Sequence, residues 1–209
     1  MTSTPFDAFS LEFAPSATQD LEFLHNLNFI PGLKEILMLR QVHALEHATV
    51  WVLSEWSNAQ GNPADSELSG GMSTEQGFYL YGQVEPLLLR RAVQTALQRI
   101  TQGEEWNLAV HPRCGTNLSV AMLLTAGLSM GASFMLPRDP LSQLLGVGLA
   151  ATAATQLAPD LGTLAQRYIT TAIPFNLRIV NISATVDVWG RSAHFIQTSW
   201  VESFDFQPT

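Results

Sequence analysis

Two adjacent runs without any charged residue constrain this chain more than any other feature. No Asp, Glu, Lys or Arg occurs in 114–137 or in 140–159. The apolar parts of these runs, 118–136 and 141–158, each reach the roughly 18–20 residues that a helix needs to cross the hydrocarbon core of a bilayer. A turn with the sequence Pro-Arg-Asp-Pro, at 137–140, separates them. The pattern predicts a two-helix transmembrane hairpin.

Small residues recur at a spacing of four in both runs, at Gly127 and Gly131 and at Gly146 and Ala150. This spacing lets helix backbones approach each other closely in lipid. The alternative is a pair of fully buried helices in a soluble protein. Two neighbouring uncharged runs joined by a charged turn favour the membrane hairpin instead.

The basic residues predict the orientation of this hairpin. Of the ten Lys and Arg residues, only Arg138 lies in the turn between the two runs. The others precede or follow the hairpin. By the positive-inside rule, this distribution places both termini in the cytoplasm.

The rest of the chain mixes helix and strand patterns, and 57–71 is predicted to be a loop of small and acidic residues. The predicted helices are 33–56 and 86–100, and the predicted strands are 77–82, 106–110, 177–189 and 193–200, with a turn at Gly190-Arg191. The expected class is α+β, a small mixed helix/strand domain with an inserted two-helix transmembrane hairpin. The expected divisions are an N-terminal arm at 1–30, a cytoplasmic-side domain built from 31–114 and 160–209, and the hairpin at 115–159.

The net charge and the motifs bear on two kinds of partner. Lys and Arg number 10 against 18 Asp and Glu, which gives a net charge of −8, so phosphate backbones would be repelled. The chain has no Walker A loop and no G-x-G-x-x-G, so nucleotide binding has no support. We therefore expect neither nucleic acid nor nucleotide as a ligand, and the lipid bilayer as a partner.

Two of the five His residues lie four apart in the segment His43-Ala44-Leu45-Glu46-His47. On a helix these positions share one face, so both imidazoles can reach one ion. The order H-x-x-E-H is that of the inverzincins, in which the two His bind zinc and the Glu is a general base. His43 and His47 are therefore candidate zinc ligands, and Glu46 is the candidate catalytic residue.

A complete metal site needs further ligands, and the segment 111–117 offers two. His111 and Cys114 flank a Pro-containing turn, and Cys114 is the only Cys in the chain. All four ligands together would form a closed site, which is typical of a structural metal. Three of them plus a water would leave the open position that a catalytic metal uses.

Each of these residues also has an ordinary structural explanation. His43 and His47 fit core histidines on an apolar helix, and Glu46 fits an ion pair with Arg40. Cys114 fits an inert buried thiol, because free Cys is among the most buried residue types. Their joint occurrence in two short segments favours the metal site.

The two segments also resemble a known pair of motifs. HALEHA at 43–48 followed by HPRCGT at 111–116 resembles the signature of the YqhQ-type bacterial membrane proteins, which are described as metal-dependent enzymes. A longer stretch, about 37–185, is similar to an uncharacterised membrane-protein family associated with cyanobacteria. The resemblance implies a metal site of His43, Glu46, His47, His111 and Cys114 in a plasma or thylakoid membrane.

The chain departs from the YqhQ-type motif at two points. Ala48 stands where that motif has Lys, and the acidic residue nearest to the end of the helix is Glu55. No activity or substrate is therefore carried over from those proteins.

Three functions remain open at this stage. The first is a membrane-anchored, zinc-dependent hydrolase in which Glu46 deprotonates a water. The second is a non-catalytic, metal-stapled assembly or interaction factor of a membrane protein complex, such as a photosynthetic one. The third is a membrane domain whose His and Cys residues serve only packing. A closed four-ligand site without a cleft would favour the second function.

Overall fold

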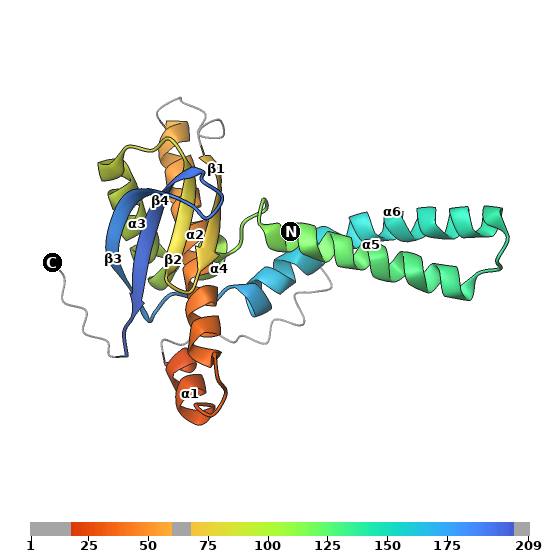
Figure 1. Ribbon diagram of the computed structural model, residues 1–209, viewed down its shortest axis with the longest axis horizontal. Coiled ribbons are helices and arrows are strands. Elements are labelled where there is room, and N and C mark those ends of the chain that lie inside the picture. Colours follow the sequence, from red (N-terminus) through yellow and green to blue (C-terminus); the bar gives the residue numbers. More distant parts are fainter. Residues whose placement is uncertain (1–17, 60–67, 203–209) are drawn as a thin grey trace.

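The computed structural model describes residues 18–59 and 68–202. Figure 1 shows a domain of helices and strands, from whose side a long helical hairpin projects. The predicted α+β class with two inserted apolar helices is confirmed.

Four antiparallel strands form one sheet in the order β1–β2–β4–β3. The inner strands β2 (Gly77–Gly82) and β4 (Ser192–Trp200) come from opposite sides of the hairpin in sequence. They pair with Phe78 opposite Ile196, and both side chains are fully buried. The outer strands are β1 (Leu68–Thr74) and β3 (Leu177–Val186). The sheet therefore joins the two parts of the chain that the hairpin separates.

The central helix is α2 (Leu33–Ala59), which contacts the sheet and packs against α3 (Pro86–Thr101). Gly32, with a φ of 80°, precedes it, in a backbone conformation that favours glycine. Val42, Leu45 and Val52 form part of the core and are fully buried. In Figure 1, α2 runs across the base of the hairpin, so one side of it lies on the core and another lies near the hairpin.

Two of the sequence predictions were wrong. Residues 106–110, predicted as a strand, form the short helix α4 (Glu105–Ala109). A short apolar run has no decisive periodicity, and here it packs Leu108 and Ala109 into the core as a single helical turn. Of the predicted loop at 57–71, residues 57–59 belong to α2 and 60–67 lie outside the described residues. Its end belongs to β1, because pairing with β2 overrides the low strand propensity of its glycines.

The N-terminal part of the described chain is attached to α2. The predicted arm at 1–30 includes α1 (Gln19–Asn26), and residues 1–17 lie outside the described residues. The Gln41 side chain of α2 donates a hydrogen bond to Asp20 of α1 at 2.5 Å and a second to Asn176 at 3.2 Å. One buried amide of α2 therefore connects α1 with the segment that directly precedes β3.

The hairpin consists of α5 (Gly115–Met135) and α6 (Pro140–Ala165), which continues as the π-helical turn η3 (Gln166–Thr170). Both helices are long and apolar enough to span a membrane, and α5 has no buried residue. The buried residues of α6 are small and recur every four positions: Gly146, Ala150, Ala154, Ala158 and Gly162. The spacing of Gly146 and Ala150 therefore does mark a close helix contact, whereas Gly127 and Gly131 have open space around them.

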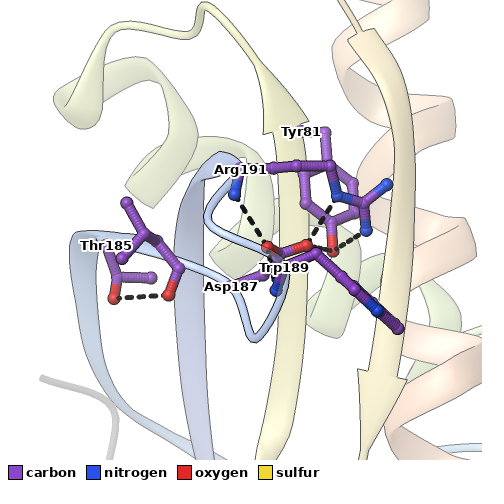
Figure 2. Close-up of polar contacts among 6 residues, drawn as sticks. Tyr81, Thr185, Asp187, Trp189 and Arg191 are labelled. Atoms are coloured by element: carbon purple, nitrogen blue, oxygen red, sulfur yellow. Dashed lines mark hydrogen bonds and ion pairs between the residues drawn. The ribbon is translucent and has the colours of Figure 1, made fainter.

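Asp187 holds the turn between β3 and β4, as Figure 2 shows. Its carboxylate accepts hydrogen bonds from the backbone N–H groups of Trp189 and Arg191, from Arg191 Nε at 2.7 Å and from the Tyr81 hydroxyl at 2.8 Å. The Arg191 guanidinium also stacks on the Tyr81 ring at 4.2 Å. Burial alone would raise the pKa of Asp187, but these bonds lower it to about 2. The turn is therefore tied to β2 as well as to its own strands.

Candidate metal centre

Three of the predicted ligands meet where α2 faces the base of the hairpin. The ligand atoms of His43, His47 and Cys114 all lie within 4.8 Å of one another. His43 and His47 are one turn apart on α2, and their ring centroids are separated by 4.4 Å. Cys114 approaches from the start of α5, and its Sγ lies 3.3 Å from His43 Nε2. Two segments far apart in sequence thus supply one cluster of donors.

Helix ends hold both imidazoles in place. His43 Nδ1 lies 3.0 Å from the carbonyl oxygen of Thr170, at the end of η3. His47 Nδ1 lies 2.6 Å from the carbonyl oxygen of Ala109, at the end of α4. The last carbonyl groups of a helix have no partner within the helix, so they are available as acceptors.

These contacts fix the tautomer of each ring. A carbonyl oxygen only accepts, so Nδ1 of His43 and of His47 carries the proton and donates it. When the ring is neutral, each Nε2 then has an unprotonated lone pair, which is the form of His that binds metals. Metal-binding His residues are commonly oriented by such a bond from their second nitrogen to a backbone carbonyl. The surroundings therefore prepare both rings for coordination.

Cys114 is prepared in a comparable way. It is the N-cap of α5, and the backbone N–H of Thr116 donates to its Sγ at 3.4 Å. Burial alone would raise the pKa of this thiol, but the hydrogen bond and charge of His47, together with Thr116, lower the pKa below its ordinary value. The thiolate that this environment favours is the form of Cys that binds metal ions.

The separation of these donors suits a single ion. Ligands at zinc–nitrogen and zinc–sulfur bond lengths in a tetrahedron lie about 3.5 Å from each other. The 3.3 Å between Cys114 Sγ and His43 Nε2 is close to this value. Two imidazoles and one thiolate therefore form a set that can hold a metal ion with three protein ligands.

The fourth predicted ligand, His111, lies beside this group. Its ring centroid is 5.7 Å from that of His47, and its Nδ1 accepts a hydrogen bond from the backbone N–H of Arg113 at 3.3 Å. In the neutral ring the proton is then on Nε2, which makes that nitrogen a donor. Among the described residues, the group of ligand atoms within 4.8 Å of one another does not include a nitrogen of His111.

Glu46 is buried between α2 and β1. The Ser73 hydroxyl donates a hydrogen bond to its Oε2 at 2.5 Å. Gly71 leaves the room for its carboxylate, because a Cβ added at Gly71 would overlap it. Burial raises the pKa of Glu46, although the Ser73 hydrogen bond and the charge of His43 oppose the rise. A raised pKa brings a carboxylate closer to the range in which it exchanges protons near neutral pH.

Sequence reasoning missed Gly71 and Ser73, which it placed in or next to a loop. The available signal was the pair Gly70-Gly71 followed at a short distance by the aromatic strand at 77–82, which together are compatible with a hairpin.

The base of the hairpin is held by a small polar network that sequence reasoning also missed. The backbone N–H of His111 donates to Gln166 Oε1 at 2.8 Å, and Gln166 Nε2 donates to Asn117 Oδ1 at 2.7 Å. Asn117 Nδ2 in turn donates to the Pro112 carbonyl at 2.8 Å. Asn117 near the start of α5 and Gln166 at the start of η3 thereby hold the loop that carries Cys114.

A cavity of about 650 Å³ adjoins the centre. All five candidate residues line it, and Gly70, Gly71 and Ser73 of β1 form another part of its wall. Ile36, Leu39 and Ile169 also line it and are exposed. The three ligand residues therefore border a space large enough for part of a substrate.

The sequence is similar to that of an uncharacterized protein from the cyanobacterium Picosynechococcus sp., with 53% identity over 196 residues that cover 91% of this chain and 94% of the relative. No solved structure matches the chain. Neither this relative nor the family match links the chain to the YqhQ-type proteins, whereas the expected cyanobacterial relationship is confirmed. A domain of unknown function, DUF6391, matches residues 38–182, which include every residue of the candidate centre. The chain therefore belongs to the DUF6391 family.

Proposed function

We propose that this protein is a membrane-anchored, zinc-dependent hydrolase. The observation that carries the proposal is a group of three donors, His43, His47 and Cys114, that borders a cavity also lined by Glu46. Zinc in proteins normally takes four ligands in a tetrahedron, and catalytic sites use three protein ligands and leave one position for water. Three protein donors beside a cavity match the catalytic pattern.

Each residue has a distinct role in this proposal. A zinc ion held by His43, His47 and Cys114 would lower the pKa of a water in the open position toward neutrality. Glu46 would accept the proton of that water and later pass it to the leaving group. Ser73, by its hydrogen bond, keeps the Glu46 carboxylate in the cavity wall. Thr170 and Ala109 orient the two imidazoles through their carbonyl groups.

The membrane location is part of the proposal. Apolar side chains of α5 and α6 such as Leu123, Phe134, Leu144 and Leu149 are exposed, which suits contact with lipid. We propose that the two helices cross the plasma or thylakoid membrane with both termini in the cytoplasm. The centre, at the base of the hairpin, would then lie at the cytoplasmic surface of the bilayer.

The test compares Glu46→Gln with Glu55→Gln, an exposed control on the same helix that pairs with Arg99. Full-length protein in detergent is assayed for zinc by mass spectrometry and for hydrolysis of p-nitrophenyl acetate, an activated ester. We expect Glu46→Gln to keep its zinc and to lose roughly 10²–10⁴-fold in rate, the usual contribution of a general base. Glu55→Gln should keep both. Zinc-free wild-type protein, or an unchanged rate in Glu46→Gln, would overturn the proposal.

The alternative function is a non-catalytic, metal-stapled assembly or interaction factor of a membrane protein complex. A purely structural zinc site is usually closed by four protein ligands. Among the described residues, the ligand group has three members, and Glu46 lies in the cavity wall beside them. These features support the hydrolase over the alternative.

A further inference from the structure

We infer that the substrate of this centre is an extended polypeptide segment, which binds as an additional strand along the free edge of β1. The inference rests on the proposed hydrolase function and adds the substrate class to it. Its basis is the position of one strand edge relative to the candidate metal centre.

The sheet order leaves β1 at an edge. Within residues 18–59 and 68–202, β1 pairs with β2 on one side and has no strand on the other. An edge strand presents a row of backbone N–H and C=O groups that can pair with another chain. Extended peptides commonly bind proteins by adding a strand to such an edge.

The edge lies beside the proposed catalytic groups. Gly70, Gly71 and Ser73 of β1 line the same cavity as the ligand residues and Glu46. Glu46 is in contact with β1 itself, since its carboxylate accepts the Ser73 hydrogen bond and packs on Gly71. A peptide that pairs with this part of β1 would pass next to both Glu46 and the residues that would hold the metal.

Two features of β1 suit the approach of a second backbone. Gly70 and Gly71 are exposed and have no side chain that would cover the backbone at the cavity. The register with β2 shifts between Leu68 and Gly70 and is regular from Gly70 to Thr74. The regular part of the strand is therefore the part that borders the centre.

The reaction is hydrolysis of a peptide bond. Strand pairing would fix the peptide backbone in an extended conformation and bring one carbonyl group to the metal. The oxygen of water adds to the carbonyl carbon, the C–N bond breaks, and one product is a carboxylic acid, which releases its remaining proton to the solvent. Glu46 takes a proton from the water and delivers it to the departing nitrogen, which leaves as an amine. Water is the only co-reactant.

A lipid ester is the competing substrate class, because Ile36, Leu39 and Ile169 at the cavity are apolar and exposed. A lipid ester cannot form the repeated backbone hydrogen bonds that a strand edge offers, whereas an extended peptide can form them. The glycine-containing edge beside the general base therefore favours a polypeptide. Since α2 crosses the base of the hairpin in Figure 1, such a segment would lie close to the membrane surface.

The experiment uses zinc-loaded full-length protein in detergent and a library of fluorescence-quenched peptides, with cleavage sites identified by mass spectrometry. Glu46→Gln protein, prepared in parallel, is the control: cleavage that is present in wild type and absent from this variant does not come from a co-purified protease. Peptides that are cleaved are then made again with N-methyl groups on single backbone amides near the cleavage site. Amides in a strand point alternately to opposite sides, so N-methylation at alternate positions should lower the rate roughly tenfold, and N-methylation at the positions between them should not.

Ester hydrolysis separates the two proposals. If p-nitrophenyl acetate and a fluorescent phospholipid are hydrolysed in a Glu46-dependent way while no peptide is cleaved, the hydrolase proposal stands and the polypeptide inference is wrong. Equal cleavage of N-methylated and unmodified peptides would overturn pairing with β1. If the protein binds no zinc and hydrolyses neither ester nor peptide, both proposals fail.

Discussion

Cys114 Sγ lies 3.3 Å from His43 Nε2, although the two residues are 71 positions apart in the chain. Cys114 directly precedes α5, and Thr170, whose carbonyl group holds His43 Nδ1, ends η3. Both ends of the hairpin thus contribute to the geometry of the centre. The two helices proposed to anchor the protein also position one ligand and orient another.

The first prediction concerns the ligand set. If the centre holds zinc as proposed, substitution of His43, His47 or Cys114 by Ala is expected to abolish zinc binding, because each takes away one of three converging donors. His111→Ala should keep the zinc, since His111 Nδ1 accepts the Arg113 N–H and the Nε2 proton makes the other nitrogen a donor. Zinc content after dialysis, measured by mass spectrometry, checks the four variants.

The control for these variants is their fold, measured by circular dichroism and thermal unfolding. Loss of zinc from a folded His111→Ala protein would show that His111 is a fourth ligand. The site would then be closed, as structural zinc sites are, and the non-catalytic function would gain support.

The elements predicted correctly from the sequence have strong local signals. Two long uncharged runs give the hairpin, and uninterrupted helical spacing gives α2 and α3. The segment 106–110 was assigned wrongly because a short apolar run fits either a strand or a helix. Its true form matters for the centre, because the end of α4 provides the carbonyl group that holds His47.

In the candidate site, too, the residues with a local sequence signal could be predicted and those that depend on distant packing could not. The side chains of His43, Glu46 and His47 are recognisable because their spacing on a helix has a chemical meaning. The two imidazoles are held by the backbone carbonyls of Thr170 and Ala109, which any residue type supplies and which no motif records. Such partners depend on how distant segments pack, so local sequence patterns do not reveal them.

The second prediction concerns the contact between α5 and α6. Gly162 is buried on α6, and a Cβ added there would overlap the Asn117 side chain. Gly162→Ala is expected to destabilise the protein by about 1–3 kcal/mol, as overpacking usually does. It should also weaken zinc binding, because Asn117 and Gln166 hold the loop before α5. Unfolding in detergent and zinc titration measure the two effects.

Gly127→Ala provides the matched control within the hairpin. Gly127 lies on α5 with no atom within 4 Å of an added Cβ, so Ala fits there without overlap. Alanine favours a helix over glycine by up to about 1 kcal/mol, and the control should therefore be neutral or stabilising. Equal effects of the two substitutions would mean that Gly162 and Asn117 are not packed together.

The third prediction concerns membrane orientation. Green fluorescent protein fused at either terminus should fluoresce in a bacterial host, because we place both termini in the cytoplasm. Alkaline phosphatase inserted in the turn at 137–140 should be active, because that turn would lie on the opposite side of the membrane. The physical reason is the bias of Lys and Arg away from this turn. Active phosphatase at either terminus would contradict the proposed orientation.

The fourth prediction follows from the lowered pKa of Asp187. Burial opposes ionisation of this carboxylate, but the hydrogen bonds from Arg191 and Tyr81 outweigh it and lower the pKa to about 2, from an ordinary value of 3.8. When the pKa of a carboxylate is lower in the folded state than in the unfolded state, its ionisation stabilises the fold at every pH above the unfolded-state pKa. This stabilisation is lost as the pH falls toward the folded-state pKa. Wild-type protein should therefore lose more stability than Asp187→Asn between about pH 4 and pH 2.

Denaturation in detergent across this pH range measures the difference between the two proteins. Glu75→Gln, which removes an acidic group from the exposed turn between β1 and β2, controls for the change in net charge. At neutral pH, Asp187→Asn should be less stable than Glu75→Gln. The reason is that an amide replaces the carboxylate that accepts hydrogen bonds from Arg191 Nε and from two backbone N–H groups. The stability gap between Asp187→Asn and wild type should then narrow as the pH falls. A gap that stays constant down to pH 2 would show that the Asp187 carboxylate is not stabilised by these contacts.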